Sequence, residues 1–526
     1  MAVTANQHAT DAAVEILQLG GNALDAAIAA QWVLNLVEPQ SSGLGGGGFL
    51  LHWDAGARRI HAWDGRETAP RSLGADFGRQ ADGIPLSFTD VLASGKAVGV
   101  PGLLATLEAA HHRHGKLKWA RLLAPAIRLA ENGFPLSPRL YQLLREDALL
   151  RRDAAAFALY YLADGEPRPV GSLLRNSALA AVLRRIADEG SAALHRGELA
   201  ARLAAAVEQR GGRLELDELR DYRPREREAV CGSFRRWRIC GMPPPSSGGI
   251  AALQILGILE RSGLSPGSPE RPEAVHVFAE AGRLAYADRA RHVADPDFVV
   301  VPQRELLTST YLERRARLID PQRAMGKAAP GEFDSRNTHA DGVAPELPAT
   351  THLSVVDREG NAVALTSSIE SAFGSRIQID GFLLNNQLTD FSLGGNLAAN
   401  RPEPGKRPMS SMSPTLVFDA QGRLHAVLGS PGGSRIINYV ARSLLAVLDG
   451  QMEAAAALSM GHVGNRNGVT EVERGRVSPD LVRDLEARGH VVQSFDMTSG
   501  LHLIVRRDGR WIGAADPRRE GAARGE

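Results

Sequence analysis

The amino-acid sequence predicts an α+β fold in which sheets are layered with helices. Residues 102–213 are rich in Ala, Leu and Arg, which is typical of helices, whereas strand-like alternation of apolar and polar residues gathers after residue 350. Short polar turns join the strand candidates, and such turns favour antiparallel pairing. With 526 residues, 44% of them hydrophobic, the chain can bury a large core, and its length alone would permit about two to four domains.

The first part of the chain begins with two predicted helices. The helical pattern of residues 11–19 ends at the glycine pair 20–21, and residues 23–37 form a second, very apolar helix with Asn22 as its candidate N-cap. The other elements predicted before residue 350 are a strand at 49–53, a strand at 237–240, a helix at 250–261 and a polar loop or linker at 324–348.

A different pattern begins at Thr350. Residues 350–357 and 361–367 alternate as strands do, and the Arg-Glu-Gly sequence at 358–360 supplies a hairpin turn between them. The elements predicted after this hairpin are strands at 415–418 and 424–428 and a helix at 434–448.

Composition and charge exclude several classes of protein. The 61 Lys and Arg residues balance 60 Asp and Glu residues, so no net field attracts nucleic acid or an anionic membrane, and the expected partner is a small molecule or peptide. Apolar stretches such as 250–259 are too short to span a membrane. Two cysteines, Cys231 and Cys240, cannot build a disulfide framework or a four-cysteine metal site; one bridge and two separate thiols both remain open.

Three short motifs suggest a known kind of site but lack the structural context that such a site needs. Residues 43–48 satisfy G-x-G-x-x-G, but a helix precedes them and a strand follows, the reverse of a dinucleotide site, so a close backbone approach near a pocket is predicted instead. Residues 263–267 satisfy G-x-S-x-G, but they follow a helix and contain a proline that prevents the required helix. The histidines within 111–114 lie together at a helix end, where adjacent side chains do not converge, so no metal site is predicted.

Thr350 is the candidate nucleophile. A threonine hydroxyl needs a base beside it, and the residue's own α-amine becomes such a base once the preceding peptide bond is cut. The position fits because a polar linker ends at Ala349 and a strand begins at once. A strand that merely opens with two threonines is the alternative interpretation.

Three polar runs farther along carry complementary chemistry. The run 429–435, Gly-Ser-Pro-Gly-Gly-Ser-Arg, lies between a strand and a helix, where free backbone N–H groups form an oxyanion cradle. In 407–414, two adjacent serine hydroxyls stand between prolines, in stiff backbone suited to binding a carboxylate. The run 385–390, Asn-Asn-Gln-Leu-Thr-Asp, offers hydrogen-bonding groups to a substrate ammonium, unless its aspartate simply caps a turn.

Together these pieces resemble the gamma-glutamyltransferase family of N-terminal-nucleophile hydrolases. Individually several are loose, but in this order they are specific, and they run along nearly the whole chain. Besides the four pieces above, the resemblance covers residues 20–27, 43–49, 64–67, 99–102, 242–249, 281–297 and 515–519.

The resemblance implies a four-layer αββα sandwich that is made as one inactive chain and cuts itself between Ala349 and Thr350. A large piece, 1–349, and a small catalytic piece, 350–526, would remain associated as a heterodimer within one intertwined domain. Thr350 would attack the carbonyl of a γ-glutamyl amide such as glutathione, with its own amine as base. Water would complete hydrolysis, an amino acid or dipeptide amine would complete transfer, and no cofactor is required.

The family's other site residues map onto matching positions. Arg suits the carboxylate because its planar fork pairs with it in a bidentate way. The implied roles are oxyanion stabilisation by Gly432 and Gly433, binding of the α-carboxylate by Arg66, Ser410 and Ser411, binding of the α-ammonium by Asp390, Gln387 and Glu370, and contact with the nucleophile by Ser368.

Three departures from the family pattern have consequences. Ser368 stands where the family usually has Thr; its hydroxyl can make the same bond with less rotamer restraint. Glu370 stands where many members have Asn, and it would add attraction for an ammonium. The segment 392–407 is short and contains no aromatic residue, so the lid loop with its Tyr is expected to be missing, leaving an open pocket that favours hydrolysis and bulky groups.

The compartment and two rival functions stay open. No signal segment precedes Ala2, so we favour a periplasmic or secreted protein if the N-terminus has been trimmed and a cytoplasmic one if Met1 is native. The nearest rival function is a glutaryl-type acylase, such as a cephalosporin acylase, on the same scaffold. Such a substrate has no α-ammonium and would leave the acidic and amide groups unpaired. A non-catalytic scaffold protein is the rival of another class.

Overall fold

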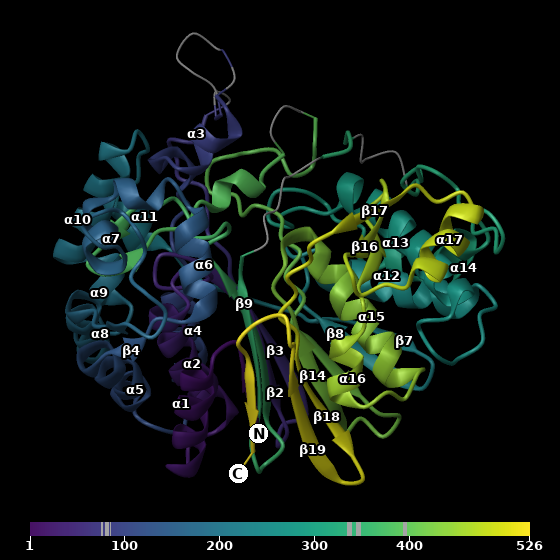
Figure 1. The fold of residues 1–526 in the computed structure, drawn as a ribbon, viewed down its shortest axis with the longest axis horizontal. Helices are drawn as coiled ribbons and strands as arrows, with labels where there is room; N and C mark the ends of the chain where they lie inside the picture. The colour runs from purple at the N-terminus through teal and green to yellow at the C-terminus, as the bar shows by residue number, and fades with distance from the viewer. Residues whose placement is uncertain are drawn as a thin grey trace.

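Two sheets face each other at the centre of the protein, and helices cover their outer sides (Figure 1). The computed structural model describes residues 1–74, 77–78, 84, 86–333, 339–342, 349–392 and 397–525. Every pairing within these two sheets is antiparallel. The α+β prediction is therefore confirmed.

The first sheet has seven strands and interleaves segments that are distant in sequence. The hairpin β9–β10 lies between β1 and β2, so strands from after residue 350 sit between strands from the N-terminal region. In spatial order the strands are β20 (Ala522–Arg524), β1 (Ala2–Thr4), β9 (Thr351–Val356), β10 (Ala362–Ser368), β2 (Gly47–Asp54), β3 (Arg59–Gly65) and β6 (Arg225–Arg227).

The second sheet has six strands, and three smaller sheets lie outside the pair. In spatial order the second sheet contains β19 (Arg510–Ala515), β18 (His502–Arg507), β14 (Leu424–Gly429), β13 (Thr415–Phe418), β8 (Trp237–Gly241) and β7 (Val230–Phe234). The smaller sheets are β15 (Val463–Asn465), β16 (Thr470–Glu473) and β17 (Val492–Phe495); β11 (Gln378–Ile379) and β12 (Phe382–Leu383); and β4 (Phe134–Pro135) and β5 (Leu173–Leu174).

The helices form two groups, one outside each main sheet (Figure 1). The first group is α1 (Gln7–Gln18), α2 (Ala23–Val37), α4 (Leu103–His114), α5 (Trp119–Asn132), α6 (Pro138–Glu146), α7 (Ala154–Tyr160), α8 (Ser177–Glu189), α9 (Ala192–His195), α10 (Gly197–Gln209) and α11 (Leu216–Asp221), with the short α3 (Phe88–Leu92) nearby. The second group is α12 (Gly248–Arg261), α13 (Pro272–His292), α14 (Ser309–Ala316), α15 (Ile436–Leu448), α16 (Ala454–Ser459) and α17 (Pro479–Ala487).

Both faces of the first sheet are buried, and alternation along its strands divides their side chains between two cores. In β2, Leu50 joins the core shared with the first helix group, whereas Phe49 and Leu51 join the core between the sheets. Because both cores are apolar, the polar residues at the strand ends are candidates for catalytic or binding roles.

Most predicted elements are present, with shifted boundaries. Asn22 caps α2 as predicted, and Asp25 completes a capping box. The predicted helix 11–19 begins earlier, at Gln7, because Asn6 caps it. The predicted helix 434–448 is wrong at its start, where Gly433–Arg435 form a 3-10 turn before α15.

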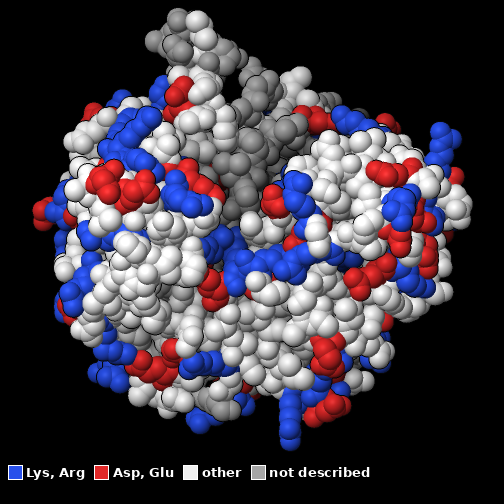
Figure 2. Space-filling model, in the orientation of Figure 1, with Lys and Arg blue, Asp and Glu red and all other residues white. Residues whose placement is uncertain are grey.

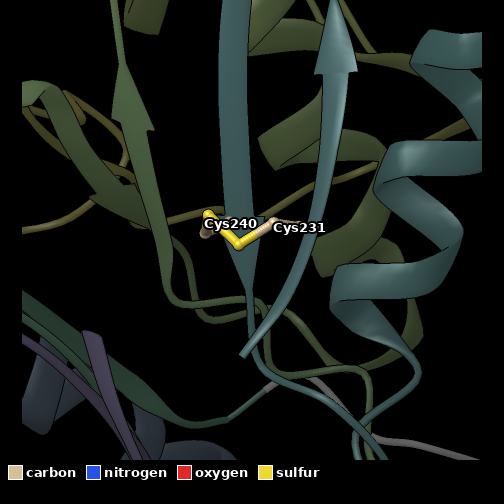
Figure 3. The surroundings of a disulfide bond; sticks show 2 residues. All are labelled: Cys231 and Cys240. Carbon is tan, nitrogen blue, oxygen red and sulfur yellow. A yellow bond between two sulfur atoms is a disulfide. The ribbon is translucent and has the colours of Figure 1, made fainter. Parts of the chain in front are cut away.

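The two cysteines form a disulfide across the β7–β8 hairpin (Figure 3). Cys231 and Cys240 are directly opposed in the register of these two strands. The structure therefore has the disulfide bridge and not the two separate thiols, the alternatives that the sequence left open.

Surface charge is mixed. Basic and acidic side chains are interspersed over the face seen in Figure 2, with one basic run across its middle. Among the described residues, no helix combines the length and the apolar character that crossing a bilayer requires.

Candidate active site

Thr350 lies immediately before β9, beside the end of β10. The register pairs Thr351 with Ser367, so Thr350 and Ser368 also lie together, and their hydroxyl oxygens are 3.0 Å apart. Thr350 is buried, and its φ of 73° lies in the left-handed region that β-branched residues rarely adopt. Such a conformation costs about 1–3 kcal/mol and persists only where the surroundings hold it, so the chain is strained at this residue.

Ser368 is held in place from two sides. The backbone N–H of Glu370 donates to Ser368 Oγ at 2.9 Å, which leaves the serine hydroxyl hydrogen available to Thr350. A Cβ on Gly46 would lie 2.1 Å from the Ser368 carbonyl oxygen, so only glycine fits there. This close contact is the backbone approach predicted for the glycine-rich run 43–48.

Acidic and amide side chains gather on one side of the site. Gln387 Nε2 and Arg66 Nη2 each donate to Asp390 Oδ2 at 2.6 Å. Asn386 Nδ2 donates to Glu370 Oε2 at 2.7 Å. Gln387 Oε1 is buried and has no hydrogen-bond partner in the described part of the chain. A buried acceptor in this state calls for a donor such as a ligand ammonium.

The protein itself uses much of the guanidinium of Arg66. Arg66 Nε donates to the Pro408 carbonyl at 3.0 Å, and Nη2 donates to the Met409 carbonyl at 2.9 Å as well as to Asp390. Nη1 lies 3.9 Å from Glu67 Oε2. Nε and Nη2, one side of the guanidinium that could pair with a carboxylate in the expected bidentate way, therefore already bond to groups of the protein. Nη1 is the nitrogen left for a ligand carboxylate.

Ser410 and Ser411 are fixed in the loop before β13. Ser410 Oγ accepts the N–H of Met412 at 3.1 Å, and Ser411 Oγ accepts from Arg289 Nη2 at 2.9 Å. Arg289 is a buried residue of α13 whose Nε also donates to Ser247 at 2.8 Å. The sequence analysis gave Arg289 no role, because nothing in the helical pattern around it points to a site.

The two glycines of the predicted oxyanion cradle have positive φ angles, 136° at Gly432 and 59° at Gly433. A Cβ on Gly432 would lie 2.6 Å from Tyr439 Cε2, so the turn requires glycine there. Gly433 opens the 3-10 turn that precedes α15, which places it at the start of a helical segment, as the sequence predicted.

One small pocket gathers nearly all the predicted site residues. Of the predicted residues, Gly432 and Ala349 do not line it. The lining residues are Arg66, Thr350, Ser368, Glu370, Gln387, Asp390, Ser410, Ser411, Met412, Gly433 and Ile436.

Arg519 contacts the backbone on both sides of the bond that precedes Thr350. Its Nη1 donates to the Thr350 carbonyl at 2.9 Å, and its Nη2 donates to the Ala349 carbonyl at 3.4 Å. Burial lowers the pKa of Arg519 to about 9, which still leaves it charged at neutral pH. The sequence analysis included residue 519 in the resemblance but assigned it no function.

Glu67, next to Arg66, is neutral at pH 7. Burial raises the pKa of Glu67 to about 8, and the Arg66 charge opposes that shift only in part. Asp390 therefore balances the charge of Arg66.

This raised pKa predicts a pH-dependent stability. Between about pH 4.5 and 8 the unfolded chain has lost the Glu67 proton while the folded protein retains it, so stability falls as pH rises through this window. The Glu67→Gln variant should gain stability over the wild type by a few kcal/mol more at pH 8 than at pH 5, on the order expected for a buried carboxyl. Urea unfolding of both proteins at matched concentration measures this; an equal difference at the two pH values would contradict it.

A family model described as Gamma-glutamyltranspeptidase matches residues 9–526. The chain is 35% identical over 540 residues to the glutathione hydrolase proenzyme of Bacillus subtilis (strain 168), covering 100% of this chain and 91% of that protein. It is 36% identical over 534 residues to the Acylase ACY 1 proenzyme of Pseudomonas sp. (strain V22), covering 99% and 92%. The crystal structure of cephalosporin acylase from Bacillus halodurans has a TM-score of 0.86 and 27% identity, covering 99% of this chain and 94% of that one. The chain therefore belongs to the gamma-glutamyltranspeptidase family of N-terminal-nucleophile hydrolases.

Proposed function

We propose that this protein hydrolyses and transfers the γ-glutamyl group of glutathione and other γ-glutamyl amides through an acyl-enzyme on Thr350. The observation that carries the proposal is the pocket itself, in which the Thr350 hydroxyl shares one small cavity with Asp390, Gln387 and Glu370. A nucleophile facing an amide and two carboxylates suits an acyl donor that carries an ammonium. The relative named a glutathione hydrolase supports the same substrate class.

The proposal begins with self-cleavage between Ala349 and Thr350. Thr350 Oγ1 attacks the Ala349 carbonyl carbon, and an ester forms as the C–N bond breaks and the hydroxyl proton passes to the departing Thr350 nitrogen. Water then hydrolyses that ester. Arg519 donates to the Ala349 carbonyl and would stabilise the negative charge that develops on this oxygen. Relief of the positive φ at Thr350 would favour the cut, since the freed residue has no preceding peptide to constrain it.

The two pieces, 1–349 and 350–526, would remain together as a heterodimer. Strands β9 and β10 of the small piece lie between β1 and β2 of the large piece, so separation would break both pairings and expose the sheet edges and both cores. The facing sheets and their outer helices support the four-layer αββα sandwich of the family (Figure 1). The relatives named as proenzymes support the cut itself.

In the catalytic cycle, the freed α-amine of Thr350 takes the hydroxyl proton as Oγ1 attacks the γ-glutamyl carbonyl. The N–H groups of Gly432 and Gly433 stabilise the oxyanion, and Ser368 steadies Thr350 through its hydroxyl. The amine returns the proton to the leaving nitrogen as the amide C–N bond breaks. Water then releases glutamate from the ester, or an acceptor amine takes the glutamyl group.

The α-carboxylate and α-ammonium of the glutamyl group would be held by two neighbouring sets of side chains. Ser410, Ser411 and Arg66 Nη1 bind the carboxylate, and Arg289 holds Ser411 in place. Asp390, Gln387 Oε1 and Glu370 bind the ammonium.

The predicted absence of the lid loop concerns the segment 392–407. Residues 393–396 of the segment 392–407 lie outside the described residues. We retain the prediction that an open pocket favours hydrolysis over transfer and tolerates bulky leaving groups, because it follows from the length and composition of the segment.

A glutaryl-type acylase is the second candidate function. The Acylase ACY 1 relative and the similarity to cephalosporin acylase favour it. The paired anilides of γ-glutamate and glutarate separate the two functions, because they share a leaving group and differ only in the α-ammonium. We expect kcat/KM on the γ-glutamyl anilide to be about 100-fold higher or more, since the glutaryl group leaves buried polar groups unpaired. A faster glutaryl reaction would assign the acylase function instead.

A further inference from the structure

Four titratable side chains meet on the first sheet, away from the pocket. His52 in β2 is directly opposed to His61 in β3, and Asp54 lies two residues beyond His52, so all three side chains project from the same face. His114, the last residue of α4, lies over that face, with its ring centroid 4.2 Å from that of His61 and 4.8 Å from that of His52. One ligand atom each from Asp54, His61 and His114 lies within 4.8 Å of the others.

This spacing is close to that of a metal site. A tetrahedral ion with bonds of about 2.1 Å holds its ligand atoms roughly 3.4 Å apart. Side-chain rotations that move the ligand atoms by about 1 Å would therefore complete the geometry. His52 adds a third imidazole, and so a fourth side chain, next to His114. Three imidazoles and one carboxylate form a donor set typical of zinc proteins.

The lack of hydrogen-bond partners for His52 among the described residues is a second, independent observation. His52 is 3% exposed, and neither of its ring nitrogens has a hydrogen-bond partner in the described residues; His114 Nε2 is in the same state. Buried polar atoms normally have partners, because leaving one unsatisfied costs about 1–3 kcal/mol of desolvation. A bound cation would satisfy these lone pairs.

The surrounding groups hold the cluster ready to bind a cation. Glu226 Oε1 lies 2.8 Å from His61 Nδ1, and a carboxylate only accepts, so Nδ1 carries the hydrogen and Nε2 keeps its lone pair. The Ala57 N–H donates to Asp54 Oδ1 at 2.8 Å, which fixes that carboxylate in place.

We propose that His52, Asp54, His61 and His114 bind a divalent transition-metal ion of the zinc class. Imidazole nitrogens with one carboxylate select Zn²⁺, Ni²⁺ or Cu²⁺ over Mg²⁺ and Ca²⁺, which prefer oxygen ligands throughout. The ion would tie the end of α4 to strands β2 and β3.

This site is separate from the nucleophile. In the β2–β10 register, His52 is opposite Val363 and Gly47 is opposite Ser368, five residues farther along the strand. At about 3.3 Å per residue, the cluster lies roughly 17 Å from Ser368. Its role is therefore structural, and its test does not depend on catalysis or on self-cleavage.

Calorimetric titration with Zn²⁺ tests the proposal. The full-length protein, free of any affinity tag, is treated with EDTA, dialysed and titrated with Zn²⁺ alone. We expect one ion per chain and a binding constant at least about 10-fold weaker in His114→Gln. Zn²⁺ should raise the Tm of the wild type by roughly several degrees and that of His114→Gln much less. His114→Gln changes a half-buried residue at a helix end, so circular dichroism should show an intact fold.

The control is His112→Gln, an exposed histidine of the same helix that is outside the cluster. It should bind Zn²⁺ as the wild type does. The substitution of Co²⁺ for Zn²⁺ gives a second readout, since its visible absorption reports nitrogen and oxygen ligands in tetrahedral geometry. Absence of Zn²⁺ binding in the wild type, unchanged binding in His114→Gln, or an equal loss in His112→Gln would each overturn the proposal.

Discussion

The Thr350→Ala protein should remain a single chain and should have no measurable γ-glutamyl turnover. The wild type should instead appear on a denaturing gel as two pieces, of 349 and 177 residues according to the numbering. Both losses would have one cause, because in the proposed mechanism the same hydroxyl attacks the Ala349 carbonyl in self-cleavage and the substrate carbonyl in catalysis. Removal of a nucleophile that acts with its base costs on the order of 10⁴-fold or more in kcat.

A matched variant separates the chemistry from damage to the fold. Thr351→Val removes the hydroxyl of the neighbouring residue but keeps its branched shape, and it should still be cut and active. N-terminal sequencing of its small piece should begin at Thr350. Cleavage of Thr350→Ala at the same bond would refute the assignment of the nucleophile, and an uncut, inactive wild type would favour the scaffold alternative.

Strands β9 and β10 were predictable because the sequence patterns that indicate them are local. The alternation at 350–357 and 361–367 and the Arg-Glu-Gly turn between them predict the β9–β10 hairpin, and the structure has it with strands at Thr351–Val356 and Ala362–Ser368. Short strands such as β1 and β20 have three residues each, too few to show a period, and neither was predicted from the sequence. Their pairing depends on the rest of the sheet.

The residues around Thr350 were predictable where they lie close together in the sequence. Gln387 and Asp390 share one short turn, and Ser410 and Ser411 are adjacent, so local composition marks both sets. By contrast, Arg519 reaches a carbonyl 170 residues away in the chain. No periodic pattern encodes such a contact.

The same limit applies to Arg289 and to the histidine cluster. Arg289 lies in a helix whose pattern is explained by packing, and it contacts a serine 122 residues away. The sequence analysis was correct that neighbouring histidines on α4 do not converge. His114 instead converges with residues of β2 and β3, because the helix ends over that sheet.

The second large effect should come from Asp390→Asn. This change keeps the shape of the side chain and removes its negative charge, so the pocket loses the carboxylate that Arg66 and Gln387 both contact. Truncation of one partner of a buried charge pair between protein and ligand costs about 2–5 kcal/mol, so we expect kcat/KM on the γ-glutamyl anilide to fall about 100-fold or more. Measurement of kcat and KM separately should show much of the loss in KM, since the ammonium is bound before the chemistry.

Loss of the Arg66 partner could also disturb the pocket, and the glutaryl anilide distinguishes the two causes. That substrate has no ammonium, so a recognition defect should lower its kcat/KM far less than that of the γ-glutamyl anilide, whereas a distorted pocket should lower both equally. Asp496→Asn is the matched control, because Asp496 is 83% exposed and pairs with Arg474 at the surface, where such a pair contributes about 0–1 kcal/mol. An unchanged ratio of the two substrates in Asp390→Asn would mean that Asp390 supports Arg66 and leaves the ammonium to Glu370 and Gln387.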